Sequence, residues 1–586
     1  MVLVLSRKPW KYLLSIIGFT LLAASCAPAA QPAPAPAAQP PSAAPSAAPT
    51  AAPAAPAAAP TAAPAAPRAT ATLAPAAAAP APKPATTAPR KGGTFTFGSY
   101  IRMADHDPHT AASVLITWDL AANGLLDLNN NTQEPLPDLA EKWEVSKDGT
   151  VYTFHLYKGV KFQNVAPVNG REMTADDVVY SFNRIRSDNP RFARRSLFED
   201  VKSIKALDKY TVQFTLATPS GPFLTYVANQ YNKVVAKEVV DKFGDLQPKL
   251  SAIGTGPYLL KTARDPFFFE MTRNPDYFQK DRPKVDVVRT QVIEDDITRA
   301  AALRTGQIDV AVRIPPSAYQ SVKSNTNLVW DSEAVPWATQ LIFQVNKKPW
   351  NDVRVRRAVH LAINRDEVVQ GAHEGAAEIS GPLAPVVFRW AALQPDELRK
   401  LPGYRQPKDQ DIAEAKKLLA DAGFPNGFEI SMPVSNWAAF VNLQPPEVVK
   451  GNLAKIGIKV NFKTLEQAAY IAAERDGDFE MMTRAIFTSV EPDAQLSSIY
   501  SKTGSRNPVG LSDPQIEVLL VKGRSTLDRE ERKKVYRDIQ MIILDKAYRA
   551  YMDEPFTYTG KQKYLKNYDG QWILDNRQVI DVWLDK

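Results

Sequence analysis

The sequence contains few groups of residues that could carry out covalent or metal chemistry. The densest cluster is His106-Asp107-Pro108-His109, whose two imidazoles and carboxylate are suitable ligands for a metal ion. Pro108 breaks any helix that would align them, so the alternative is a polar surface loop, and we predict no metal site. Gly254-Thr255-Gly256-Pro257-Tyr258 lacks the spacing of a phosphate-binding loop, and Pro257 has no amide hydrogen, so we predict a rigid turn.

Motifs of the common hydrolases are also missing from the sequence. It has neither a Gly-x-Ser-x-Gly elbow nor the His-Glu-x-x-His spacing of zinc peptidases, and it has five histidines in total. The acidic run Glu294-Asp295-Asp296 is typical of a helix start, where carboxylates favour the helix dipole. We therefore predict a protein that is not an enzyme, with no catalytic residue and no cofactor.

The N-terminus has the features of an export signal. Basic residues at Arg7, Lys8 and Lys11 precede an apolar run from Leu13 to Leu22, which is too short to span a bilayer comfortably. Small residues follow up to Cys26, the only cysteine in 586 residues, and the ending resembles a bacterial lipobox with Ala23 where Leu is favoured. We predict a signal peptide at 1–25 and lipidation of Cys26; the alternative is an ordinary cleaved signal.

Residues 26–91 would form a tether, because they are almost entirely Ala and Pro and cannot build a core. Residues 1–91 hold seven basic and no acidic residues, so they account for seven of the eight net positive charges of the chain. The remaining chain is nearly neutral and gives no electrostatic reason to expect nucleic acid as a partner. We predict an extracytoplasmic protein held at the cell membrane by its lipid anchor.

From Gly92 onward, strand and helix patterns alternate. Period-two alternation predicts strands at Val151–Leu156, Tyr210–Leu216 and Lys459–Lys463. Helical spacing predicts one helix capped by Thr174, and another that Asp411 opens and Gly423 ends. Asp148-Gly149 is expected to form a turn between strands. This mixture over roughly 500 residues predicts α/β lobes.

A series of short blocks resembles, in order, the large solute-binding proteins of peptide and nickel ABC importers. These blocks are Leu139–Phe154, Lys158–Phe162, Thr174–Val178, Gly254–Tyr258, Arg273–Tyr277, Gly306–Asp309, Phe343–Asn346, Asp352–Val359 and Leu418–Pro425. One departure is a small insertion at Asn164–Gly170. Each block is only moderately specific, but their common order covers the chain from 92 to its end.

The resemblance implies a fold and a function. The fold would be the two-lobed, type II fold of periplasmic binding proteins, large and with an extra subdomain in lobe one. Lobe one would comprise 92–343 plus 551–586, and lobe two 344–550. The chain would be a monomer that captures a peptide or similar small-molecule solute between its lobes and delivers it to the permease and ATPase subunits of an ABC importer.

The same resemblance suggests four ligand-binding residues, each with a structural alternative. Asp493 would pair with the ligand's amino group, or it caps a helix. Trp337 and Trp437 would offer flat aromatic surfaces, or they pack in the core. Arg389 would meet a ligand carboxylate, or it is a solvated surface residue.

Three alternative functions stay open at this point. Within the same class, the ligand would be a nickel chelate or an oligosaccharide. In other classes, the chain would be a surface-tethered hydrolase, or the ligand-binding accessory of a sensory receptor.

Overall fold

The computed structural model describes residues 90–100, 107–110, 116–244, 246, 251–264, 267–335, 337–435, 444–487, 491–569 and 576–586. The elements below all belong to the unit Pro84–Lys586. The predicted signal peptide, Cys26 and nearly all of the predicted tether lie outside the described residues.

A ten-stranded mixed sheet runs in the order β17-β13-β18-β11-β1-β10-β9-β8, with β12 and β14 also paired to β18. Strand β1 is parallel to both β10 and β11, whereas the other pairs are antiparallel. The strands are β1 (Thr94–Ser99), β8 (Tyr258–Arg264), β9 (Phe268–Arg273), β10 (Val287–Val292), β11 (Val310–Ile314), β12 (Leu328–Ala334), β13 (Trp337–Phe343), β14 (Ala377–Ile379), β17 (Met481–Phe487) and β18 (Arg549–Gln562).

A separate four-stranded antiparallel sheet has the order β4-β5-β7-β6. Its strands are β4 (Ala140–Val145), β5 (Val151–Leu156), β6 (Val201–Asp208) and β7 (Thr211–Leu216). Helix α2 (Ala175–Arg186) packs on it, with the Phe182 ring edge-on to Phe214 at 5.1 Å between centroids. The remaining elements outside residues 344–550 are β2 (Leu126–Leu128), β3 (Pro135–Pro137), β19 (Leu565–Lys566), β20 (Trp583–Leu584), α1 (Ile116–Ala121), α3 (Phe223–Val227), α4 (Lys237–Phe243), α5 (Asp296–Arg304), α6 (Pro316–Gln320), and the 3-10 helices η1 (Ala193–Phe198) and η2 (Asn576–Asp581).

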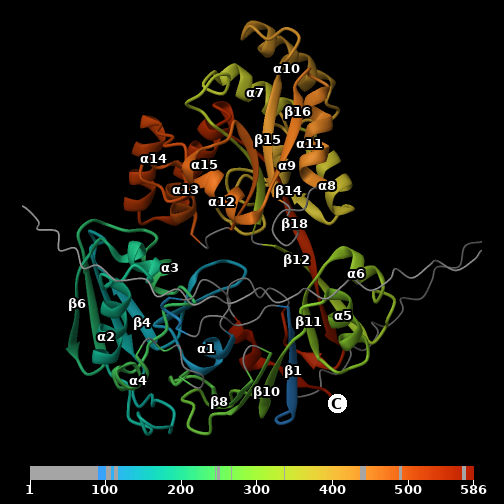
Figure 1. Ribbon diagram of the computed structural model, residues 1–586. Helices are drawn as coiled ribbons and strands as arrows, with labels where there is room; N and C mark the ends of the chain where they lie inside the picture. Colours follow the sequence, from blue (N-terminus) through green and yellow to red (C-terminus); the bar gives the residue numbers. More distant parts are fainter. Residues whose placement is uncertain are drawn as a thin grey trace, which may run out of the picture. The chain divides into compact units, whose positions relative to one another are not determined.

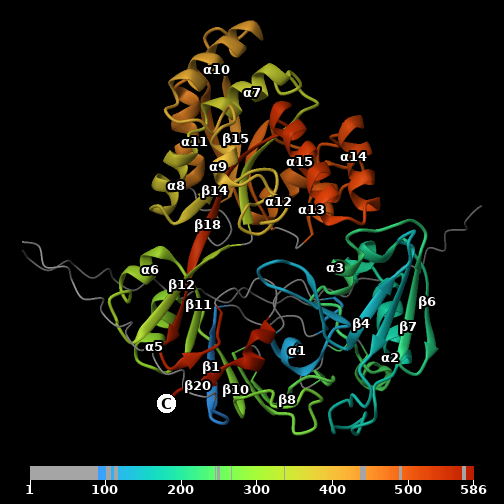
Figure 2. The ribbon, with the colours of Figure 1, turned by 180° about the vertical axis from the view of Figure 1, so that it is seen from behind.

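Residues 344–550 are mainly helical around a parallel pair, β15 (Glu429–Ser435) and β16 (Lys459–Leu465). In Figures 1 and 2, α7, α8, α10 and α11 lie near this pair, and α13, α14 and α15 form another group. The helices are α7 (Val353–Ala362), α8 (Arg365–His373), α9 (Pro395–Leu398), α10 (Asp409–Asp421), α11 (Gln444–Ala454), α12 (Gln467–Asp476), α13 (Pro492–Tyr500), α14 (Pro514–Ser525) and α15 (Arg529–Asp545).

Separate hydrophobic cores underlie these parts. The largest draws its buried residues from 95–312 and 565–584, and two others draw theirs from 338–552. This partition parallels the predicted lobes, whose boundaries at 343/344 and 550/551 fall at the end of β13 and inside β18. The boundaries themselves stay predictions.

Most of the local predictions are confirmed. Strands β5 and β16 cover two of the predicted runs, and β7 covers the third from Thr211 onward, with the side chains of Val212, Phe214 and Leu216 buried on one face. Thr174 is the N-cap of α2, where the Asp177 carboxylate accepts the Thr174 N–H at 2.9 Å. Asp295 caps α5 by accepting the Thr298 N–H at 2.8 Å.

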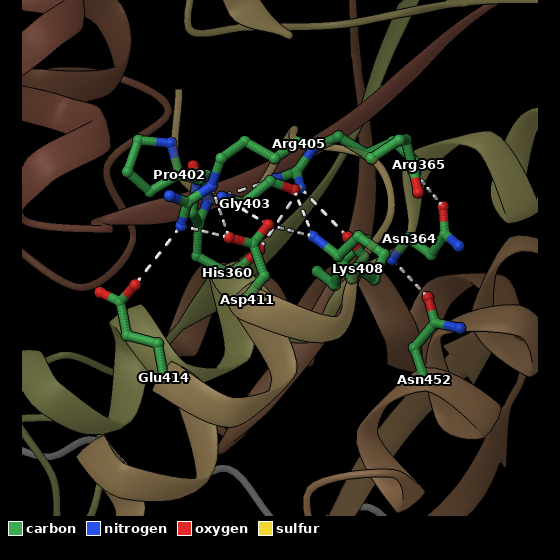
Figure 3. A network of polar contacts seen from close by, with 12 residues as sticks. His360, Asn364, Arg365, Pro402, Gly403, Arg405, Lys408, Asp411, Glu414 and Asn452 are labelled. Atoms are coloured by element: carbon green, nitrogen blue, oxygen red, sulfur yellow. Dashed lines mark hydrogen bonds and ion pairs between the residues drawn. The ribbon is translucent and has the colours of Figure 1, made fainter. Parts of the chain in front are cut away.

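The prediction for Asp411 was wrong in detail. Helix α10 begins at Asp409, with Lys408 as its N-cap, so Asp411 lies inside the first turn. Its fully buried carboxylate accepts hydrogen bonds from Gly403 N at 3.0 Å, Arg405 Nε at 2.9 Å and Lys408 Nζ at 2.7 Å (Figure 3). These donors come from the preceding loop, so Asp411 holds that loop against the helix instead of starting the helix.

Candidate functional site

A pocket of about 570 Å³ is lined by residues from 196–226 on one side and from 493–524 on the other. The first group belongs to η1, β6, β7 and α3, and the second to α13, α14 and the loop between them. The lining is polar, with hydroxyl groups from Ser196, Ser220, Ser497, Ser498, Ser501, Thr503 and Ser505. Its charged members are Glu199, Asp200, Asp493 and Arg524.

Asp493 reaches this pocket from the first turn of α13. The Glu491 side chain caps the helix by accepting the Asp493 N–H at 3.4 Å, and Pro492 occupies the first helical position, where proline is well tolerated. The positive end of the helix dipole favours a carboxylate in this first turn. The local sequence therefore explains why an acidic side chain lies here.

The carboxylate of Asp493 is buried, with 1% of its side chain exposed, and only one of its oxygens is satisfied. Asp493 Oδ2 accepts hydrogen bonds from the Tyr226 hydroxyl and from Arg524 Nε, each at 3.0 Å. Asp493 Oδ1 is buried and has no hydrogen-bond partner among the described residues. A buried acceptor without a donor is costly, so Oδ1 is a suitable acceptor for a donor group that enters the pocket.

Other charged groups hold this carboxylate in place. Arg524 Nη2 donates to Ser497 Oγ at 2.9 Å, which fixes the guanidinium beside α13. Behind the pocket, Arg532 forms an ion pair with Glu491 and donates to the Tyr536 hydroxyl at 3.0 Å. Burial and the neighbouring Asp493 charge raise the pKa of Tyr226 well above its ordinary value, so its hydroxyl stays a donor.

Outside the pocket, further contacts join the part of the chain before β13 to residues 344–550. Gly221 N donates to Arg524 O at 2.8 Å, beside the pocket. From the β2–β3 hairpin, Gln133 Nε2 donates to Val387 O at 2.7 Å, and Glu134 forms an ion pair with Arg529 at 3.1 Å. Residues 133–226 therefore contact residues 387–529 at several places.

Of the three predicted ligand-binding residues that the structure describes, only Asp493 lines this pocket. Trp337 begins β13 and is half-buried, with the Arg313 guanidinium 5.0 Å from its ring centroid. Arg389 is exposed and donates to Val386 O at 3.2 Å and to Asn131 Oδ1 at 3.4 Å. Trp437 lies outside the described residues, and the ligand-binding roles of all four stay predictions.

Sequence reasoning missed Tyr226 and Arg524, although both hold the Asp493 carboxylate. Tyr226 lies in α3 and Arg524 in the last turn of α14, where a basic residue is already explained by the helix dipole. No local pattern distinguishes either residue from an ordinary helical one, so only the tertiary structure reveals them.

The residues in the densest metal-ligand cluster that the structure describes have protein partners. Asp107 forms an ion pair with Arg184, and His109 lies between Arg184 Nη1 at 2.7 Å and Lys233 O at 2.9 Å. Burial, followed by the Arg184 charge, lowers the pKa of His109 to about 3, so its imidazole is neutral. Across the described residues, no three His, Cys, Asp or Glu side chains are grouped to hold a metal ion, and no helix has the length and apolarity to cross a membrane.

Several known proteins are similar over most of the chain. The dipeptide-binding protein of Escherichia coli strain K12 is 29% identical over 472 residues, which cover 76% of this chain and 86% of that protein. Heme-binding protein A of Haemophilus influenzae is 28% identical over 451 residues, covering 72% and 80%.

Solved structures give the same result. The periplasmic binding protein DppA of Helicobacter pylori, in complex with the peptide STSA, superposes with a TM-score of 0.68 at 27% identity, covering 85% of this chain and 99% of that one. HbpA2 of Haemophilus parasuis superposes with a TM-score of 0.72 at 26% identity, covering 84% and 100%. These matches confirm the predicted type II binding-protein fold. The family model of the bacterial extracellular solute-binding proteins, family 5 (middle region), matches residues 134–507, and the chain therefore belongs to this family.

Proposed function

We propose that this chain is the extracytoplasmic solute-binding subunit of an ABC importer and that it captures peptides or similar small organic solutes bearing an ammonium group. The family consists of solute-binding proteins, and similar proteins are named for dipeptides or were solved with a peptide. The observation that carries the ligand proposal is that Asp493 lines the pocket and that its buried Oδ1 has no hydrogen-bond partner among the described residues. A ligand ammonium would supply the missing donor.

The pocket chemistry suits a small zwitterion or a peptide end. Asp493 Oδ1 is an acceptor for an ammonium group, while the part-exposed guanidinium of Arg524 lies next to it as a donor for a carbonyl or carboxylate. Pairing with Asp493 raises the pKa of Arg524 against the effect of burial, so this cation is permanent. The hydroxyl-rich remainder of the wall would bind peptide amide groups or water.

The mechanism requires no covalent chemistry. A solute that touches both walls binds the closed form more tightly than the open form and therefore shifts the population toward closure. Moving from about 1% to 99% closed takes roughly 5.5 kcal/mol of differential binding. The permease would then receive the solute from the closed form, with ATP hydrolysed by a separate subunit.

Retention at the membrane is part of this proposal. Cys26 would be acylated after removal of residues 1–25, and the Ala/Pro-rich segment that follows would allow the monomeric binding domain to reach away from its anchor. Mass spectrometry of the membrane-extracted protein tests this part: the N-terminal peptide should carry acyl chains on Cys26. A Cys26→Ser variant should leave the membrane fraction.

The ligand experiment has two stages. Native mass spectrometry of freshly purified protein identifies any solute that co-purifies. Titration calorimetry then compares a set of tetrapeptides that have a free or an acetylated N-terminus. We expect the free peptides to bind more tightly, because acetylation removes the charge that Asp493 recognises.

A variant and its control test whether the preference for a free N-terminus depends on Asp493. Asp493→Asn should weaken binding of free-amino peptides about 10- to 150-fold, the value of one hydrogen bond to a charged group, and should leave the acetylated peptides unchanged. Asp476→Asn, at an exposed acid on α12, is the control and should change neither. Equal affinities of the Asp493→Asn variant and the native protein for free peptides, or binding of neutral oligosaccharides in preference to peptides, would contradict the proposal.

A further inference from the structure

Strand β18 changes partners near its middle. Its first half pairs with β13 up to Asp553↔Thr339, and its second half pairs with β12 from Phe556↔Ala334 onward. Glu554 and Pro555 fall between these two ladders, and there β18 pairs with β14. Figure 1 shows β18 running past this point from β14 toward β12. At this crossover β18 leaves the ladder of β13 and joins that of β12, so the two parts of β18 can bend relative to each other there while both of these ladders stay intact.

The side chain of Glu554 is buried at this crossover, with 1% of the residue exposed. Its Oε2 accepts the Val386 N–H at 3.1 Å, and its Oε1 accepts the Ser380 hydroxyl at 3.3 Å. No ion pair of Glu554 is found among the described residues. A buried carboxylate held by two neutral donors is poorly stabilised in its charged form.

The titratable groups around Glu554 are mostly acidic. Glu378 lies opposite it in register on β14, and Asp553 precedes it on β18. Asp553 is fully buried, and His373 on α8 places its Nε2 2.7 Å from Asp553 Oδ2. The Glu378 and Asp553 charges disfavour ionisation of Glu554 in addition to its burial, and the pKa of Glu554 is raised to about 8.

Glu554 also binds the segment 386–389, which contacts the β2–β3 hairpin. Val386, whose N–H it accepts, is followed by Val387, which accepts a hydrogen bond from Gln133 of the β2–β3 hairpin. Arg389 contacts Asn131 of the same hairpin. Separation of the hairpin from residues 386–389 would therefore expose the segment that covers Glu554.

We propose that Glu554 is a proton-linked switch: the closed conformation holds it neutral, and opening at the β18 crossover hydrates and ionises it. Closure would thus take up one proton. This inference rests on the closing motion in the proposed function, but it does not depend on which solute is bound. It names a regulatory residue outside the solute pocket.

The direction of the pH effect follows from linkage. The pKa of Glu554 in this structure, whose β2–β3 hairpin contacts residues 386–389 and which we take as the closed form, lies above that of a hydrated glutamate, which is about 4.3. Its contribution to closure is therefore fully present below about pH 4.3 and declines as the pH rises toward 8, after which it is lost. Within that window the ratio of closed to open protein falls by up to tenfold per pH unit.

Small-angle X-ray scattering of the full chain without ligand tests the proposal between pH 5 and pH 9. The radius of gyration of the native protein should increase with pH and level off above about pH 8. Glu554→Gln, which is neutral at every pH, should keep the compact value throughout. Glu447→Gln, at an exposed site on α11, is the control and should follow the native curve.

A second variant keeps the test valid if Glu554→Gln does not fold. Ser380→Ala removes a hydrogen bond that favours the charged form, so the scattering curve should continue to rise to a higher pH before it levels off. A flat native curve, or a Glu554→Gln curve that coincides with the native one, would overturn the switch. Peptide binding that persists in either case leaves the proposed function standing, whereas loss of peptide binding alone leaves the switch standing.

Discussion

The ion pair between Arg532 and Glu491 supports the helix that presents Asp493, and its removal should be strongly destabilising. The Arg532 side chain is 6% exposed and that of Glu491 3%. Replacing Arg532 by Met keeps most of the apolar stem but removes the guanidinium, whose Cζ lies 5.4 Å from the Trp390 ring centroid, and leaves a buried carboxylate without its cation. Breaking one side of such a buried pair costs about 3–5 kcal/mol.

The control lies five positions further along the same helix. Arg537 of α15 forms an ion pair with Glu397 at 2.6 Å, but the two side chains are 48% and 30% exposed. Exposed pairs of this kind contribute about 1 kcal/mol or less, so Arg537→Met should change the free energy of unfolding by no more than that. The two variants remove the same group from the same helix and differ in burial.

Urea unfolding followed by tryptophan fluorescence measures both variants, provided that their m values match that of the native protein. Burial, joined by the Asp493 charge, already raises the pKa of Glu491, and Arg532 opposes this rise. In Arg532→Met the pKa should rise further. A raised pKa in the folded state makes a stabilising contribution that is lost as the pH increases, so the deficit of this variant should be smaller at pH 5 than at pH 7.

A double-mutant cycle completes the argument. Glu491→Gln combined with Arg532→Met should be less destabilised than the sum of the two single variants, because the second change removes the charge that the first left unpaired. A deficit below about 1 kcal/mol for Arg532→Met, or a deficit that is the same at pH 5 and pH 7, would refute this reasoning.

Two further predictions concern the fold of residues 344–550. Asp411→Ala should lower the free energy of unfolding by about 3–5 kcal/mol, because it removes the buried carboxylate that pairs with both Lys408 and Arg405 beside α10 (Figure 3). Asp366→Ala, which breaks the half-exposed pair with Arg399, should cost less than about 1 kcal/mol in the same urea assay. Gly427→Ala would drive its Cβ into the backbone carbonyl of Gly457, so its thermal midpoint should fall well below that of Gly423→Ala, where the φ angle is also positive but no atom lies within 4 Å; equal midpoints would show that the backbone clash is relieved.

Much of the local structure could be predicted because its causes are local. Asp148-Gly149 forms the turn before β5, with Gly149 at φ +67°, and Gly306 at φ +75° follows the last turn of α5. Thr174 and Asp295 cap their helices with hydrogen bonds that span only three residues. The start of α10 was missed because Asp411 has the chemistry of a cap, yet its strongest partners are the side chains of a loop that folds back on it.

The candidate site lay beyond local reasoning for the same physical reason. Asp493 could be named because the chain resembles peptide-binding relatives, but its Tyr226 partner is 267 residues away and its Arg524 partner 31 residues away. Its buried oxygen, unpartnered among the described residues, depends on the packing of both walls, which no pattern of residue types encodes.

By itself, the sequence determined the α/β class, the order of the family blocks, and the turns and helix caps, since each depends on backbone preferences within a few residues. Only the tertiary structure decided that a carboxylate oxygen of Asp493 has no hydrogen-bond donor among the described residues, and that Arg532 pairs with Glu491 nearby. It also decided that Glu554 is buried where β18 changes partners. Burial and long-range pairing set these properties, because desolvation depends on everything packed around a group and not on its neighbours in the chain.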